Sequence, residues 1–309
     1  MTARGPGVPG KSRSRGPRRI AVVGCGFCGV GWRGADFLGW GVLRRGVVLA
    51  LGLVWLVPLY LLVVNAARPP SQDDLSQLWR LPSSFGLLDN LQVAWSRAGL
   101  GSSIASTFLY SLVAPALAVV VGASAGFAIS VLRLRHGFAW FVFVFGGTIF
   151  PVQMLIVPLF IGYGITDVYD TRHGLVLIYT AVNVPFAALV MRNFFTNVSH
   201  SLYEAATIDG ASTWSVFWRI FMPVSSSALV AIFILEFTLT WNDLLFGLTL
   251  SATDTVRPVM TALASLQSAY SGTTAPDVLA AGLVVSLPTI VVFLVAQRFF
   301  RQGLALGQL

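Results

Sequence analysis

Residues 102–132 read SSIASTFLYSLVAPALAVVVGASAGFAISVL, a run that contains no Asp, Glu, Lys or Arg. A helix needs about 20 mostly apolar residues to cross the hydrocarbon core of a bilayer, and this run is long enough. The whole chain has the same bias, because 56% of its 309 residues are apolar and only 10% are charged. Soluble domains carry about 25% charged residues, so the composition predicts an all-α membrane protein with several spans.

Further stretches on both sides of this run are also apolar enough to cross a membrane. The predicted spans are residues 47–66, 102–132, 138–161, 175–195, 226–250 and 278–300. Prolines lie inside most of them: Pro58, Pro115, Pro151, Pro158, Pro185 and Pro288. A proline within a span frees a backbone carbonyl that neighbouring helices must satisfy, so these kinks favour a packed bundle.

The arginines predict which ends of the spans face the cytoplasm, because basic residues are enriched on that side. With a cytoplasmic N-terminus, the arginines that follow residue 43 and fall inside the cell are Arg44, Arg45, Arg133, Arg135, Arg192, Arg219, Arg298 and Arg301. Those that fall outside are Arg68, Arg80, Arg97, Arg172 and Arg257. The excess predicts that both termini of the protein lie in the cytoplasm.

The first 43 residues are basic and rich in glycine, and two motifs in them are misleading. Residues 5–12 match a phosphate-binding loop, but Pro6 and Pro9 remove two of the backbone donors that such a loop needs. Residues 24–29 match a dinucleotide fingerprint without the helix and the acidic residue that should follow. We expect residues 1–43 to be a disordered tail or the result of a mis-assigned start, ahead of a membrane domain over residues 44–309.

The long cytoplasmic connection lies between the fourth and fifth spans. It reads EAATIDGASTW over residues 204–214 and VFWRIFMP over residues 216–223. Ser201 and Glu204 have the spacing of a capping box, which predicts a short helix. Gly210 is placed to end that helix through a left-handed cap.

A second short helix is expected from Ser212 or Thr213, and Pro223 should break the chain before the fifth span. The whole connection is then a helix–turn–helix segment at the membrane surface. Local physics alone leaves a second interpretation open, in which the segment is an amphipathic interfacial hairpin that only joins two spans.

The spacing of E-A-A, a glycine four residues after the second alanine, and a later hydrophobic–proline pair resembles permease subunits of ABC importers. Residues 158–160 (PLF), 241–245 (WNDLL) and 297–304 (QRFFRQGL) also look like the maltose-type second permease of the carbohydrate-uptake branch. The resemblance covers residues 44–309. It departs from the family at residues 101–103 (GSS), where Asn-Ser is frequent, and in the reduced glycine-rich end after residue 303.

This resemblance implies a type I ABC importer transmembrane domain with six transmembrane helices, in a bacterial cell membrane. It implies a permease of an ATP-dependent sugar importer, which is not an enzyme and has no cofactor, catalytic residue or metal site of its own. The implied partners are a second permease in a heterodimer, a cytoplasmic ATP-binding subunit dimer and an extracytoplasmic sugar-binding protein, within membrane lipid and without nucleic acid.

In that family the loop forms a coupling helix that docks into a cleft on the ATPase. The residues that match the coupling helix by position are Glu204, Ala205, Ala206, Asp209 and Gly210. The physics agrees with this assignment, because a carboxylate on a short helix can make a charge-assisted bond to an arginine across an interface.

Polar residues inside the fifth span form a second candidate site. The residues expected to line the substrate path are Glu236, Thr240, Trp241, Asn242 and Asp243. Glu236 and Asp243 are seven residues apart, which places them on one face of a continuous helix, and acids within the bilayer usually face a cavity or a partner. The simpler alternative is that they only make hydrogen bonds between helices of the bundle.

Two other classes of function compete with an importer permease. A proton-coupled secondary transporter would use Glu236 as the proton carrier, although the chain lacks the internal repeat that is common in that class. A membrane-embedded enzyme would need a nucleophile–base set or a metal motif, whereas His136, His173 and His200 are scattered over loops. Co-purification with an ATPase would separate a permease from a carrier that transports alone.

Overall fold

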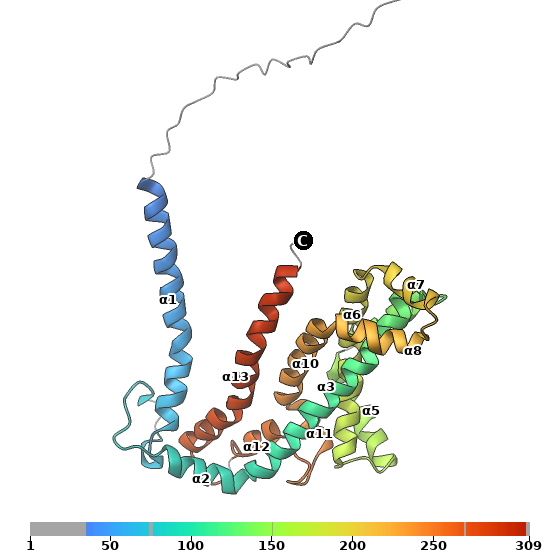
Figure 1. Cartoon of the computed structure of the whole chain (residues 1–309). Coiled ribbons are helices and arrows are strands. Elements are labelled where there is room, and N and C mark those ends of the chain that lie inside the picture. Colours follow the sequence, from blue (N-terminus) through green and yellow to red (C-terminus); the bar gives the residue numbers. More distant parts are fainter. Residues whose placement is uncertain (1–34, 74–76, 150, 269, 307–309) are drawn as a thin grey trace, which may run out of the picture. The chain divides into compact units, whose positions relative to one another are not determined.

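A computed structural model gives the structure of the chain and describes residues 35–73, 77–149, 151–268 and 270–306. Of residues 35–43, 148–149 and 298–306 it describes the backbone alone. Regular structure in these described residues is entirely helical (Figure 1), which confirms the all-α prediction. The elements are α1 (Ala35–Ala66), η1 (Pro70–Gln72), α2 (Leu87–Ala98), α3 (Leu100–Ser130), α4 (Gly137–Ile149), α5 (Val152–Ile165), α6 (Arg172–Thr196), α7 (His200–Ile208), α8 (Thr213–Val216), η3 (Phe217–Phe221), α9 (Met222–Val224), α10 (Ser226–Trp241), α11 (Leu245–Leu250), α12 (Val259–Ser265) and α13 (Ala275–Leu306).

The chain divides into two units, residues 1–55 and 56–309, and each is considered by itself. The described part of the first unit belongs to α1, which begins at Ala35, so the end of the tail expected over residues 1–43 is helical. The disorder expected of the rest of that tail, and both misleading motifs, lie outside the described residues.

The predicted spans correspond to four long apolar helices and two bent pairs of shorter ones. The long ones are Arg44–Ala66, Leu100–Ser130, Arg172–Thr196 and Ala275–Gln297. The bent pairs are Gly137–Gly147 with Val152–Ile165, and Thr213–Val224 with Ser226–Trp241. By length and composition the described residues contain four such helices, or up to six spans if each bent pair counts as one, and the upper value agrees with the predicted number.

The predicted fifth span, residues 226–250, is not one helix. Helix α10 ends at Trp241, and α11 begins at Leu245 after a short break. At the other end of α10 the chain bends by 76° between Val224 and Ser226, two residues after Pro223, where a break was expected. The Ser225 hydroxyl donates to the carbonyl of Phe221 at 2.8 Å, which satisfies an acceptor at this bend.

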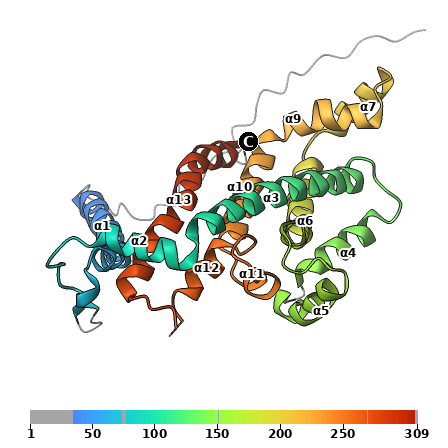
Figure 2. The same ribbon diagram turned by 90° about the horizontal axis from the view of Figure 1, so that it is seen from below.

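Helices α3 and α6 run in the same direction and form the closest helix pair of the second unit. A Cβ added to Gly122 would lie 2.5 Å from the Cβ of Ala187, and one added to Gly126 would lie 2.7 Å from the backbone N of Arg192. Small residues four apart allow such close approach in membrane bundles. Figure 2 shows α3 extending across this unit, with α6 and α10 against it.

Helix α10 joins this pair to α13. Trp241 at the end of α10 is buried, and its indole Nε1 donates to the carbonyl of Val285 at 3.0 Å. The Phe108 ring of α3 packs edge-on against Trp241, with ring centroids 4.7 Å apart. The bundle therefore has a continuous interior from α6 through α3 and α10 to α13.

Candidate functional site

The first short helix of the long connection, α7, begins one residue before its expected cap and does not form a capping box. Ser199 is at the N-cap position and makes no side-chain capping bond. The carboxylate of Glu204 instead lies 3.0 Å from Nδ1 of His200, one helical turn earlier. The capping-box prediction is wrong because the N-cap is Ser199, which puts Leu202 and not Glu204 at the third helical position.

The end of α7 is as predicted. Gly210 has a φ of +80°, in the left-handed region that costs other L-residues free energy. The N–H of Gly210 donates to Thr207 O, and the N–H of Ala211 donates to Ala206 O, both at 3.0 Å. This is a Schellman motif, so Gly210 both ends α7 and sets the direction in which the chain leaves it.

The second short helix, α8, also starts where expected. Ser212 is its N-cap and accepts a hydrogen bond from the N–H of Ser215 at 3.3 Å. A π-helical stretch, η3, and the short α9 then carry the chain to the bend before α10. The segment from α7 to α9, residues 200–224, is hereafter called the coupling segment.

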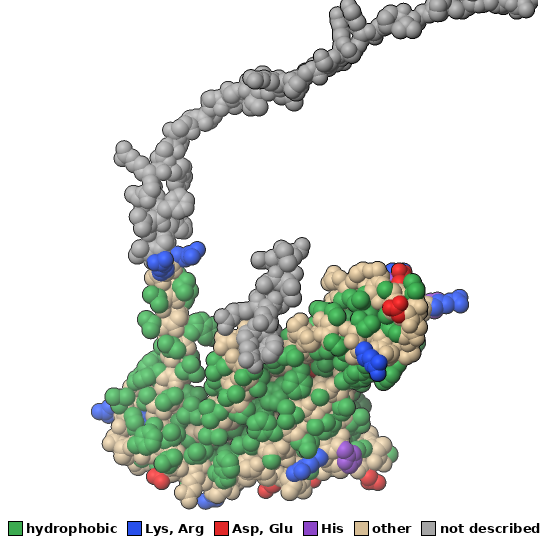
Figure 3. Space-filling view, viewed as in Figure 1, with side chains coloured by type: hydrophobic (Ala, Val, Ile, Leu, Met, Phe, Trp, Pro, Cys, Tyr) green, Lys and Arg blue, Asp and Glu red, His purple; other side chains and the backbone are tan. Residues whose placement is uncertain are grey.

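The exposed side chains of the coupling segment include both charged and apolar ones. The Glu204 side chain is 63% exposed, and Ile208 and Trp214 are 85% and 69% exposed. Ala205, Asp209 and Gly210 are also exposed, whereas Ala206 is half-buried against the core. Charged side chains gather around apolar ones at the end of the molecule where α7 lies (Figure 3).

Aromatic rings anchor the coupling segment to the rest of the bundle. Phe127, near the end of α3, is surrounded by rings of α6, α7 and η3. Its ring centroid lies 5.0 Å from Phe221, 5.2 Å from Phe217, 6.1 Å from Phe195 and 6.3 Å from Tyr203. These rings come from four elements, so the coupling segment packs against the ends of α3 and α6 together.

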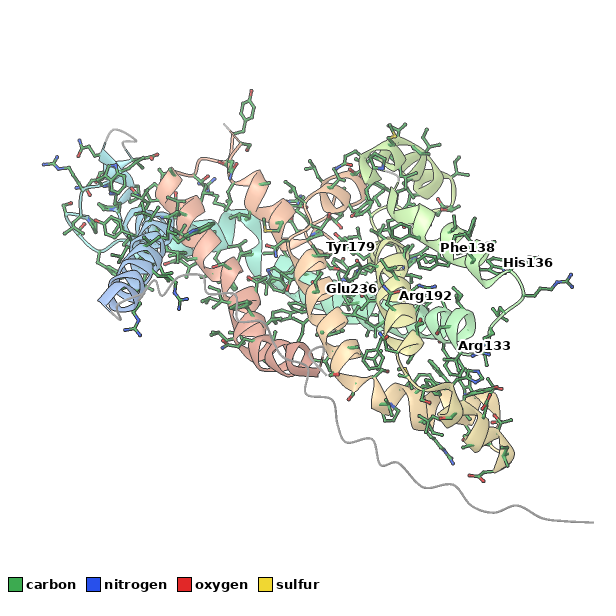
Figure 4. All side chains as sticks on the ribbon, turned by 90° about the horizontal axis from the view of Figure 1, so that it is seen from above. Arg133, His136, Phe138, Tyr179, Arg192 and Glu236 are labelled. Atoms are coloured by element: carbon green, nitrogen blue, oxygen red, sulfur yellow. The ribbon has the colours of Figure 1, made fainter. Side chains whose placement is uncertain are left out.

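The acids of the fifth span do not share one helical face, since α10 ends before Asp243. Glu236 lies in α10 (Figure 4) and is fully buried. Among the described residues neither of its carboxylate oxygens has a hydrogen-bond partner. Asp243 accepts from the Tyr179 hydroxyl at 2.9 Å and from the N–H groups of Phe246 and Gly247 at 3.1 and 3.3 Å. It therefore caps α11 and ties it to α6.

The other candidate path residues point in several directions. Thr240 is buried, and its hydroxyl oxygen accepts a hydrogen bond from the Asn183 amide of α6 at 3.2 Å. Trp241 is turned toward α13, and Asn242 is exposed with its amide donating to Thr238 O at 2.8 Å. Their roles in a substrate path stay predictions.

A hydrogen-bonded cluster near the N-terminal ends of α3 and α6 is not predicted by the sequence. The Asp170 carboxylate accepts from the N–H groups of Ala252 and Thr253 at 2.8 and 3.0 Å. Partial burial acts to raise the pKa of Asp170, but these bonds and the nearby Arg257 guanidinium outweigh it and hold the pKa below its usual value. No sequence pattern joins residues so far apart, so only the fold reveals this contact.

Residues 118–304 match the family described as binding-protein-dependent transport system inner membrane component. The chain is 31% identical over 262 residues to "Probable ABC transporter permease protein YurM" of Bacillus subtilis, covering 84% of each chain. It is 30% identical over 276 residues to the trehalose transport system permease protein SugB of Mycobacterium tuberculosis, covering 87% of this chain and 96% of that one.

A similar fold occurs in a solved structure, described as a bacterial ABC transporter involved in the import of the acidic polysaccharide alginate. The match has a TM-score of 0.70 at 20% identity and covers 86% of this chain and 98% of the other. At that identity the likeness concerns the fold, and it agrees with the bundle of α3, α6, α10 and α13.

Proposed function

The chain belongs to the family of binding-protein-dependent transport system inner membrane components, and from this premise we propose that it carries a carbohydrate, driven by ATP hydrolysis in a partner. Its trehalose-system relative supports a sugar as the substrate class. Membership of this family places the chain in a different class of transporter from a proton-coupled carrier that works alone.

The partners proposed are a second permease, a cytoplasmic ATPase dimer and an extracytoplasmic binding protein. The family description itself supports dependence on a binding protein. Apolar side chains along α13, including Leu287, Val291 and Phe293, are about half exposed or more. A second permease and lipid would cover such a surface, since exposed apolar patches mark interaction sites.

The coupling segment is proposed to dock on the ATPase, with the chain oriented so that both termini are cytoplasmic. The observation that supports this most strongly is the contrast between its exposed and its packed side chains. Glu204, Ile208 and Trp214 are exposed, whereas Phe217 and Phe221 pack against Phe127 of α3. A carboxylate beside exposed apolar side chains suits a binding cleft that supplies an arginine.

In this mechanism the ATPase moves the coupling segment, and the segment moves the spans. A push on α7 reaches α3 and α6 through the rings around Phe127, and it reaches α10 through η3 and α9. The site for the transported sugar is proposed among the polar residues of α10, where Thr240 and Asn183 form a hydroxyl–amide pair. Hydroxyl and amide groups suit a substrate rich in hydroxyls.

Charge reversal at Glu204 tests the proposed docking. Glu204→Lys should weaken association with the ATPase about tenfold or more, because the change removes a charge-assisted bond and adds repulsion to an arginine. The measurement is co-purification of the ATPase with the permease, and Asp89→Lys, an exposed acid of α2, is the matched control. Equal recovery of the ATPase with both variants would show that Glu204 does not contact it.

A further inference from the structure

His200 makes a hydrogen bond through each of its two ring nitrogens, and the two partners belong to different helices. Nδ1 lies 3.0 Å from the Glu204 carboxylate oxygen, within α7. Nε2 lies 3.3 Å from the backbone carbonyl of Val131, the residue that ends α3. The ring thus bridges the exposed carboxylate of the coupling segment and the end of a membrane-spanning helix.

Both partners of the ring can only accept a hydrogen bond. A backbone carbonyl has no hydrogen to donate, and an ionised carboxylate is an acceptor only. A neutral imidazole has one N–H, so it can satisfy one of the two contacts at a time, whereas an imidazolium has two and satisfies both. The complete bridge therefore needs the protonated ring.

No other described side chain makes these two hydrogen bonds in place of His200. The titratable and charged groups on the segments next to α7 are Arg133, Arg135, His136, Tyr203 and Arg219. Tyr203 packs against the His200 ring with centroids 5.8 Å apart, and Arg133 and His136 lie on the turn that follows α3 (Figure 4). Within the described residues, the ion pair of Glu204 is with His200.

We propose that His200 is the positioning residue for Glu204: the protonated ring holds the carboxylate in its docking orientation and ties α7 to the end of α3. This proposal rests on the proposed docking of the coupling segment to an ATPase. The Glu204 side chain remains 63% exposed, so one oxygen binds histidine while the group stays accessible to an arginine of the partner.

The bridge should matter because a free glutamate loses side-chain freedom when it docks. Ordering one flexible side chain in advance improves an interface by about three- to tenfold in affinity. The bridge also adds a polar connection from α7 to α3 beside the aromatic one. Since histidine changes charge between about pH 5 and 8, the proposal includes a pH-dependent affinity that is higher at lower pH.

The test compares His200→Gln with wild type in the complete transporter. The quantity measured is the concentration of purified ATPase subunit that gives half-maximal ATP hydrolysis with permease-containing proteoliposomes, at about pH 6 and about pH 8. We expect wild type to bind about three- to tenfold more weakly at the higher pH. His200→Gln should bind at both pH values as wild type does at the higher one.

Two further variants separate the possible outcomes. His173→Gln, which removes an exposed histidine at the start of α6, should keep the wild-type pH profile. In a double-mutant cycle, His200→Gln should have no effect once Glu204 is Gln. If wild type and His200→Gln share one affinity and one pH profile, His200 is not a positioning residue. If Glu204→Lys also leaves association unchanged, the proposed docking itself fails.

Discussion

At one end of the α3–α6 pair Phe127 packs among aromatic rings, whereas at the other end hydrogen bonds hold the loop of residues 251–258. There the Tyr110 hydroxyl donates to Val256 O at 2.7 Å, and Arg172 donates to Thr255 O at 2.9 Å. Hydrogen bonds demand one geometry, while ring pairs have several arrangements of similar energy. We therefore expect the hydrogen-bonded end to be fixed and the aromatic end to adjust while it stays attached.

This difference fits the proposed role of the coupling segment, which lies at the aromatic end. In that role the segment must remain in contact with α3 and α6 as it tilts. The loop at the other end has no such task, and its bonds to Asp170 and Tyr110 keep α11 and α12 in place beside the pair. Substitutions that weaken the contacts at one end of the pair and leave the other end intact therefore test the comparison.

The largest effect is expected from Phe127→Ala at the aromatic end. Truncating a buried phenylalanine costs about 3–5 kcal/mol of stability, and here it also removes the ring that joins four elements. We expect ATP hydrolysis to continue while sugar uptake falls at least tenfold. Uptake and hydrolysis are measured together in proteoliposomes, with Phe138→Ala, a 77% exposed ring of α4, as the control. An equal loss of sugar uptake in Phe127→Ala and Phe138→Ala would contradict a special role for Phe127.

A smaller effect is expected from Asp170→Ala at the hydrogen-bonded end. Losing the acceptor of two backbone N–H groups should lower the free energy of unfolding by only about 1 kcal/mol, because the carboxylate is partly exposed and screened. The ratio of uptake to hydrolysis should not change. The thermal midpoint of the purified protein measures the loss, and Asp254→Ala, an exposed partner of Arg257, provides the comparison.

Asp170 also makes the stability of this end depend on pH. Its pKa is lowered in the folded protein, so its contribution is complete above the usual aspartate value of about 4 and is lost as the pH falls through the folded value. The thermal midpoint of Asp170→Asn should therefore vary less with pH in this acidic range than that of wild type. Identical acid sensitivity would mean that Asp170 is not tied to the loop in solution.

A local sequence pattern predicts the structure where a single residue fixes the backbone, and it does not where contacts with distant residues determine the conformation. Gly210 was predicted to end α7 because a left-handed cap needs glycine, and its φ of +80° confirms this. Asp243 was placed on a continuous helix, but its bonds to Tyr179 and to the first N–H groups of α11 favour a break after Trp241. The partners of Phe127 and Asp170 lie far away in the sequence, so no local pattern could identify them.

The smallest structural effect is expected in the middle of the bundle, between the two ends. Glu236→Gln has the same shape without the charge, so insertion and assembly should stay within about 1 kcal/mol of wild type. Glu236→Leu should insert as well but alter the kinetics of sugar uptake if α10 lines the path. Unchanged uptake by Glu236→Leu would assign this acid to packing alone.

The most direct test of the central claim is the ratio of sugar uptake to ATP hydrolysis for Gly210→Val in proteoliposomes that contain all partners. A valine at this φ costs about 1–2 kcal/mol or more, and the strain should tilt α7 and uncouple hydrolysis from transport. Gly164→Val is the control, because that glycine lies within α5 and a Cβ there would meet nothing within 4 Å. We predict a several-fold lower ratio for Gly210→Val alone; an unchanged ratio in a fully assembled complex would show that the coupling segment is only a connector.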